Sequence, residues 1–247
     1  MTGHDFMARL IAERARELDA PSVAPAATLA TPARVVEGLR RALLDGETHY
    51  TDRPGMAPLR EHIAASLSQT LGTARGKDTV IVTNSDTEAL FACLLGLRAA
   101  SGGDNLTRGE AVLPSAGVVD DARARDGALA RLLGFDTRLV DPPFEPAWVG
   151  RFEVGTERCD VLRVSGLDAT SIRSQFKEAE SVVVGTLAGG PRVEGVSDGL
   201  SAFPVGFACV TPGLAKHART WKQALSICTA APSQRATLLA LNVEGAS

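Results

Sequence analysis

The sequence predicts an α/β fold built on a mostly parallel β-sheet with helices on both faces. From about residue 79 onward, short β-branched runs alternate with segments of helical spacing, which is the pattern of βαβ units. Right-handed crossovers between parallel strands place the intervening helices on the faces of the sheet. The chain has 247 residues, of which 45% are hydrophobic and 22% charged, so it can bury a sizeable core.

The first 48 residues are predicted to hold an N-terminal helix and an extended arm. The stretch MTGHDFMARLIAERARELD carries charges among its apolar positions, which indicates a short amphipathic helix and not a signal peptide. Residues 21–32, PSVAPAATLATP, are too rich in proline for a regular helix and are predicted to be extended. From Ala33, apolar residues recur at helical spacing as far as Gly46, which predicts a further helix.

The next part of the chain is predicted to be a turn, a helix, a strand and a second helix. The segment HYTDRPGM has the composition of a turn. Pro58 suits the first turn of a helix and apolar residues follow on one face, so we expect a helix over 58–71. The β-branched run TVIVT at 79–83 predicts a strand, and helical spacing returns over 86–100.

The rest of the chain continues this alternation. Strands are expected over 111–114, 136–141, 160–164, 181–187 and 205–210, and helices over 119–133, 169–178, 212–224 and from Pro232 to Leu241. The stretch 142–158 and the glycine-rich stretch 188–200 lack either periodicity and are predicted to be loops. With residues 1–48 set apart, residues 49–247 are expected to form one large domain.

Composition and motifs argue against several classes of function. The net charge is −3 and no long run of Lys or Arg occurs, so neither nucleic acid nor a membrane surface is expected as a partner. No stretch of about 18 apolar residues is free of charge, so no transmembrane helix is expected. No metal site is expected, because the four histidines are far apart. We expect a cytoplasmic protein with four buried, reduced thiols: Cys93, Cys159, Cys209 and Cys228.

Three stretches of the sequence carry patterns in a set order. The first fits Y-x-x-x-x-G-x-x-x-L-R-x-x-I through Tyr50, Gly55, Leu59, Arg60 and Ile63. The second is DTVIVTNSDTEALFACLLGL, a strand, a T-N turn and a helix, and the third is GFACVTPGLAKHARTWKQALSICTAAPSQRATLLAL, a strand and two helices. Together they resemble the class I/II PLP-dependent aminotransferases of fold type I.

The resemblance implies the large domain of such an enzyme, PLP as the family cofactor, and a homodimer with sites near the subunit interface. The C-terminal small domain, which carries the arginine for the substrate carboxylate in the family, is expected to be absent. The family lysine follows a strand in an S-L-S-K turn, and two registers for that turn are open here. They put Ala202 or Gly189 at the lysine position, and neither side chain carries an amine.

The phosphate cup of the family is formed by backbone N–H groups at a helix N-terminus, and here it would comprise Ser85, Asp86 and Thr87. Asp86 brings a carboxylate toward a dianionic phosphate, which costs on the order of 1–4 kcal/mol at a few ångströms. The interpretation we favour is that Ser85 or Asp86 caps the helix, with Glu88 in its first turn. Binding of a different small anion in this remnant cup is an alternative.

Other parts of the family site are also without a clear counterpart. The phosphate-binding arginine of G-x-R-x-G corresponds to Pro204 if Gly206 is the second glycine, and Arg192 is an alternative donor. No aromatic residue follows Pro114, where the ring that stacks on the cofactor would stand, and no aspartate for the pyridine nitrogen can be assigned. Tyr50 is retained; in the family it reaches the phosphate site of the partner subunit, although packing on the partner is the interpretation we favour.

The sequence therefore predicts an aminotransferase-like protein that lacks the PLP-binding lysine, needs no cofactor, and has a binding, assembly or regulatory role. The expected partner is a second copy of the chain or another aminotransferase-like chain, and the expected binding surface surrounds Tyr50 and the arm. The alternative is a PLP-dependent transaminase that works through an unusual lysine, Lys177, or together with a second subunit.

Overall fold

The computed structural model describes residues 33–102, 108–115, 121–141, 147–165, 167, 181–187 and 205–241. Four predicted segments lie outside these residues: the N-terminal helix, the arm at 21–32, the helix at 169–178 and the loop at 188–200. The boundary between residues 48 and 49 stays a prediction.

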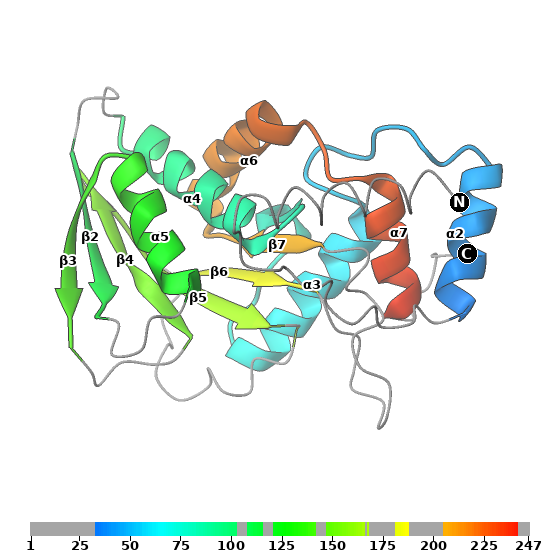
Figure 1. Ribbon diagram of the computed structural model, residues 1–247, viewed down its shortest axis with the longest axis horizontal. Helices are drawn as coiled ribbons and strands as arrows, with labels where there is room; N and C mark the ends of the chain where they lie inside the picture. The colour runs from blue at the N-terminus through cyan, green and yellow to red at the C-terminus, as the bar shows by residue number, and fades with distance from the viewer. Residues whose placement is uncertain are drawn as a thin grey trace, which may run out of the picture.

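A seven-stranded sheet runs through the molecule in the order β1-β7-β6-β5-β4-β2-β3 (Figure 1). Its strands are β1 (Val80–Thr83), β2 (Gly109–Pro114), β3 (Phe135–Val140), β4 (Trp148–Val154), β5 (Glu157–Ser165), β6 (Ser181–Thr186) and β7 (Gly206–Cys209). The helices are α2 (Ala33–Leu44), α3 (Ala57–Leu71), α4 (Asp86–Ala100), α5 (Asp121–Leu132), α6 (Pro212–Ser226) and α7 (Ala231–Ala240), and a 3₁₀ turn, η1 (Lys77–Thr79), precedes β1. The predicted elements within the described chain are therefore confirmed, apart from one loop.

The sheet is mixed, so the prediction of a mostly parallel sheet is wrong. Only the pairs β2–β3 and β5–β6 are parallel, whereas β1–β7, β7–β6, β5–β4 and β4–β2 are antiparallel. The cause in the middle of the sheet is the connection between β4 and β5. Val154 pairs with Glu157, so only two residues join the strands, and so short a turn permits antiparallel pairing alone.

Strand β4 falls within 142–158, the stretch that was predicted to be a loop, so that prediction is also wrong. The sequence pattern does not indicate this strand, because its alternation of buried and exposed residues is interrupted. The register shifts between Trp148 and Gly150, and Val149 and Gly150 are both buried in succession. The turn that follows it uses Gly155 at φ +60° in place of the Asn-Gly or Asp-Gly pairs that usually mark hairpins.

Helices cover both faces of the sheet, as predicted, because successive strand residues point to opposite sides. On one face, Ile81 of β1 belongs to a core shared with α4, α5 and α6. On the other face, Val80 and Val82 belong to a core shared with α3 and α7. Figure 1 shows α4 and α6 together on one side of the strands and α3 on the other.

The first described helix, α2, packs against α7 at one end of the molecule (Figure 1). Val35 and Leu39 are buried in a small core with α7. The other side of α2 leaves Val36, Leu43 and Leu44 at least half exposed. This helix therefore presents apolar side chains both to its own fold and to the outside.

Three of the four cysteines, Cys93, Cys159 and Cys209, are buried and unbonded, as predicted, but Cys228 is only half-buried. Burial raises the pKa of Cys159 to about 12 and raises those of Cys93 and Cys209 as well. These three thiols are therefore protonated, and unreactive as nucleophiles, near neutral pH.

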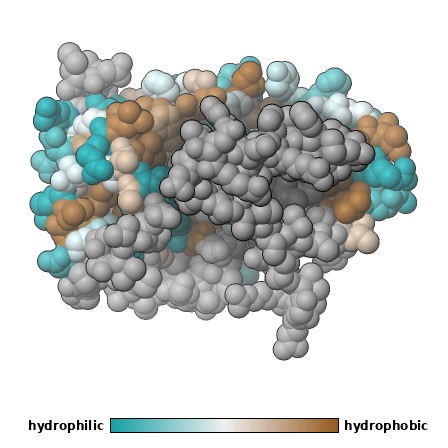
Figure 2. Space-filling view, in the orientation of Figure 1, coloured by the Kyte–Doolittle hydropathy of each residue, from teal (hydrophilic) through white to brown (hydrophobic). Residues whose placement is uncertain are grey.

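The surface of the described chain is mixed in polarity. At the end of the molecule with β2, β3 and α5, hydrophilic and hydrophobic residues are interspersed (Figure 2). None of the described helices is long and apolar enough to cross a membrane. In the same part of the chain, no three His, Cys, Asp or Glu side chains are grouped so that they could hold a metal ion.

Candidate functional site

Two residues, Asn84 and Ser85, lie between β1 and α4, and Ser85 is the N-cap of the helix. The backbone of Ser85 is extended, and its Oγ accepts a hydrogen bond from the N–H of Glu88 at 3.1 Å. The carboxylate of Glu88 accepts hydrogen bonds from the backbone N–H and the side-chain amide of Asn84, at 2.8 and 2.9 Å. This reciprocal arrangement resembles a capping box and satisfies donors at the helix start from within the chain.

Asp86, the second residue of the predicted cup, forms an ion pair with Arg163 of β5. One of its carboxylate oxygens, Oδ2, lies 2.8 Å from Nε of Arg163. The same guanidinium donates to both carboxylate oxygens of Asp126 of α5, at 2.5 and 2.9 Å. The side chain of Asp126 is only 4% exposed and that of Arg163 is 20% exposed. The guanidinium of Arg163 thus pairs with two carboxylates, those of Asp86 and Asp126, beside the start of α4.

Sequence reasoning missed both Arg163 and Asp126. They come from elements that follow α4 in the chain, and only the assembled sheet brings them to Asp86. The available signal was the charged residue inside the apolar run DVLRV, because a charge within a buried strand needs a partner.

Strand β7 brings its backbone against the same helix start. A Cβ atom added at Gly206 would lie 2.2 Å from the carbonyl carbon of Ser85 and 2.7 Å from the amide nitrogen of Asp86. Only glycine permits so close an approach of two backbones. The residues assigned to the lysine and arginine positions, Ala202, Gly189, Pro204 and Arg192, lie outside the described residues, as does Lys177.

Of the four predicted site residues, Tyr50 lines a pocket to which the described residues Ser85, Asp86 and Thr87 do not contribute. Thr87 donates through Oγ1 to Asp86 Oδ1 at 3.4 Å, so it stays with the α4 start. Tyr50 is 78% exposed and lines a separate pocket of about 470 Å³ together with His49, Met56 and Arg235.

The loop that carries Tyr50 is held in place by the fully buried Gln234 of α7. Its Oε1 accepts a hydrogen bond from the Met56 N–H at 2.8 Å. Its Nε2 donates to Thr51 Oγ1 at 3.0 Å and to the Thr229 carbonyl at 2.8 Å. The buried amide of Gln234 therefore links the Tyr50 loop to the segment between α6 and α7 through hydrogen bonds of both its oxygen and its nitrogen.

Gly55 and Arg60, both part of the tyrosine motif, also have structural roles. Gly55 has φ +106°, and a Cβ atom there would lie 2.4 Å from Cγ2 of Val82. Arg60 is buried and donates to the carbonyl oxygens of Gly55 and Lys77, each at 3.0 Å. The motif therefore specifies a loop conformation through backbone contacts.

Lys222 of α6 is a buried lysine near the α4 start. Its Nζ donates to the carbonyl of Arg53 at 3.4 Å. Burial lowers the pKa of Lys222, and the nearby carboxylate of Glu88 opposes this effect. Ser226 Oγ also donates to Glu88, so this carboxylate connects α4 with the end of α6.

No known family profile matches the chain. Over 67 residues, 27% of the chain, it is 37% identical to a probable aspartate aminotransferase of Methanocaldococcus jannaschii. Over the same length it is 40% identical to the aspartate aminotransferase of Thermotoga maritima. The matched segment spans 18% of the length of each of these relatives.

Solved structures resemble the chain over a much longer stretch. A double mutant of the Thermus thermophilus aspartate aminotransferase matches with a TM-score of 0.61 at 16% identity, covering 100% of this chain and 72% of that one. The Thermotoga maritima enzyme matches with a TM-score of 0.62 at 18% identity, covering 99% and 73%. The chain therefore has the aspartate aminotransferase-like fold of PLP fold type I, and part of its sequence is homologous to aspartate aminotransferases.

Proposed function

We propose that this chain is a non-catalytic protein of the aminotransferase fold, which acts through binding or assembly and does not use PLP. The observation that carries the proposal is the pairing of Arg163 with both Asp86 and Asp126 in front of α4. This is where the phosphate of the family cofactor would be held.

A phosphate dianion at the α4 start would stand beside the carboxylate of Asp86, and like charges at a few ångströms repel by roughly 1–4 kcal/mol. Arg163 already directs its guanidinium to two carboxylates. To bind phosphate instead, it would have to leave Asp126, and an unpaired buried carboxylate costs about 3–5 kcal/mol. The described residues around α4 therefore do not fit the cofactor phosphate.

The assembly role is assigned to the surface formed by α2 and the Tyr50 loop. Of the eight large hydrophobic side chains exposed in the described chain, four lie in this short segment: Val36, Leu43, Leu44 and Tyr50. The loop is already fixed by Gln234 and Arg60, so little conformational entropy is lost when a partner binds. We assign this surface to a homodimer, with another aminotransferase-like chain as the second kind of partner.

The cofactor part of the proposal is tested by mixing the purified full-length chain with PLP, with an active aspartate aminotransferase treated in parallel. We expect no shift of the cofactor absorbance and no adduct after borohydride reduction, as judged by intact-protein mass spectrometry. A borohydride-stable adduct on any lysine contradicts the proposal, and an adduct on Lys177 favours the transaminase alternative.

The assembly part is tested by sedimentation of the full-length chain and of two matched variants. Leu44→Glu places a charge on the proposed surface, where the side chain is 71% exposed. Leu132→Glu makes the same change at a side chain that is 76% exposed at the end of α5. We expect Leu44→Glu to shift the chain toward monomer and Leu132→Glu to have no effect. Equal behaviour of the two variants contradicts the assignment.

A further inference from the structure

A groove of about 510 Å³ follows one side of α6, and its described lining includes no residue of the α4 start. The helix contributes Pro212, Ala215, Lys216, Arg219, Thr220 and Gln223, whose spacing of three and four residues places them on one face. The opposite wall consists of Arg53 and Pro54 from the Tyr50 loop and of Asp78 and Thr79 from η1. The volume is within the range of small-molecule sites, roughly 300–1,000 Å³.

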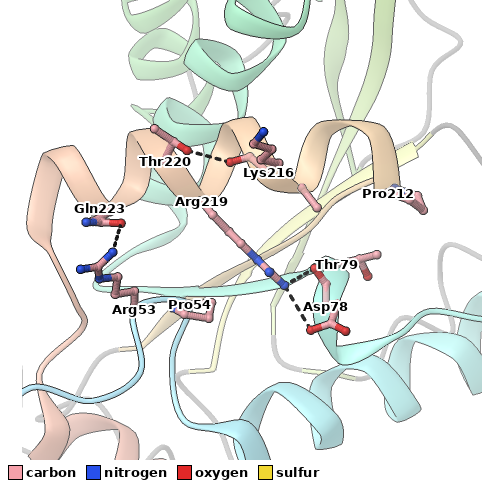
Figure 3. A pocket seen from close by; sticks show the side chains of 10 residues that line it. Arg53, Pro54, Asp78, Thr79, Pro212, Lys216, Arg219, Thr220 and Gln223 are labelled. Atoms are coloured by element: carbon pink, nitrogen blue, oxygen red, sulfur yellow. Dashed lines mark hydrogen bonds and ion pairs between the residues drawn. The ribbon is translucent and has the colours of Figure 1, made fainter.

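Three cations and one carboxylate line this groove, so positive charge is in excess. Arg219 reaches across from α6 to the carbonyl of Asp78, and its Nη2 lies 3.5 Å from the carboxylate of the same residue (Figure 3). Arg53 extends from the opposite wall and donates to Gln223 Oε1 at 3.2 Å (Figure 3). Together with Lys216, these side chains give the lining a formal charge of about +2.

The charge of Arg219 is only partly balanced. Asp78 is 81% exposed and is shared with Arg60, whose Nη1 lies 3.7 Å from the same carboxylate oxygen. Both guanidiniums thus approach one oxygen atom, and burial, followed by the charge of Arg219, lowers the pKa of Arg60. Within the described chain, Nε of Arg219 is buried and has no hydrogen-bond partner.

We infer that this groove binds a small organic anion with two acidic groups, either carboxylates or phosphates. Two guanidiniums on opposite walls offer forked donors, which match the oxygens of carboxylate and phosphate groups. Pro54, Pro212 and Ala215 provide an apolar surface for the carbon skeleton between those groups. The inference uses no residue of the α4 start, so it is independent of the cofactor part of the proposed function, but it shares Arg53 and Pro54 with the Tyr50 loop of the assembly part.

The test is calorimetric titration of the full-length chain with succinate, inorganic phosphate and pyrophosphate in a phosphate-free buffer of low ionic strength. We expect at least one probe to bind with a Kd of about 1 mM or tighter. Arg219→Gln and Arg53→Gln are each expected to weaken that binding about tenfold. Preference for succinate indicates a dicarboxylate ligand, and preference for the phosphates indicates a phosphate ester.

Two control variants locate the binding. Arg108→Gln removes an 81%-exposed arginine paired with Asp136 at the sheet edge and should leave the Kd unchanged. Asp86→Asn would tighten binding if the anion occupied the α4 start, and it should have no effect on binding in the groove. Because Arg53 is exposed, Arg53→Gln is expected to fold even if Arg219→Gln does not.

The inference is overturned if no probe binds, if both arginine variants bind as tightly as the natural chain, or if Arg108→Gln weakens binding as much as they do. It is also overturned if Asp86→Asn changes the Kd as strongly as the groove variants.

Discussion

The Tyr50 loop and the α4 start are both parts of the shared fold, but they are held in different ways. In the loop, Gln234 and Arg60 bond mainly to backbone N–H and C=O groups. At the α4 start, the guanidinium of Arg163 bonds to the side chains of Asp86 and Asp126. The first set of contacts specifies a backbone path, whereas the second specifies a local charge.

The contacts that fix the path of the loop and the contacts that set the charge at the start of α4 are therefore made by different residues. The hydrogen bonds to backbone groups maintain the shape of the loop, and this requirement does not depend on what the protein binds. Charged side chains around a helix N-terminus decide instead which anion can enter. Four substitutions test the separate roles of these two sets of contacts.

Gly206→Ala is expected to be the most damaging change. The new Cβ would lie 2.2 Å from the backbone of Ser85, so β7 or the α4 start has to move. We expect a loss of about 3 kcal/mol or more in the free energy of unfolding, measured by urea denaturation. Gly213→Ala in α6 is the matched control, because a Cβ there meets nothing within 4 Å. A loss below about 1 kcal/mol for Gly206→Ala would show that the contact is loose.

Arg163→Met is expected to destabilise the fold by about 3 kcal/mol, because it leaves the buried Asp126 without its partner. The double variant Arg163→Met with Asp126→Leu should recover most of that loss, since an apolar pair replaces the ionic one. The free energies of unfolding of the natural chain, the two single variants and the double variant, measured by urea denaturation, form a double-mutant cycle. If the double variant is less stable than Arg163→Met alone, the unpaired carboxylate of Asp126 is not the cause of the destabilisation.

Gln234→Ala is expected to cost about 2 kcal/mol, because it removes three hydrogen bonds and leaves the Met56 N–H without its partner. Hydrogen exchange of the Met56 amide should accelerate more than exchange in β6, which lies in the sheet. Gln223→Ala, which loses only a bond to the exposed Arg53, serves as the control. An unchanged exchange rate of the Met56 amide would show that Gln234 does not hold the Tyr50 loop in place.

Lys222→Met is expected to have the smallest effect, and that effect depends on pH. Because burial lowers the pKa of Lys222 below 10.5, the unfolded chain binds more protons than the folded chain between the two values. The stability of the natural chain therefore rises with pH through this window, and the variant lacks this rise. We expect the variant to be at least as stable near neutral pH, with its advantage shrinking as the pH approaches 10.5. An advantage that grows with pH would contradict this sign.

The sequence predicted the parts of the fold whose signal is local. The run VIVT and the helical spacing after it identify β1 and α4, and Ser85 followed by Glu88 identifies the cap. The direction of the strands was not predictable in the same way, because β4 alternates irregularly around Gly150 and its pairing depends on a two-residue turn. The partner of Asp86 was missed because Arg163 meets it only across the assembled sheet.

The turn at Gly155 also affects the order in which the sheet can form. It pairs Val154 with Glu157, which are separated by only two residues in the chain. Isolated hairpins of this kind close in about 1–10 μs. The pairing of Val80 with Cys209 instead joins distant parts of the chain, which is slower because a long loop must close. Since β4 also pairs with β2 and β5 with β6, an early hairpin would offer both of its edges for the later strands to join.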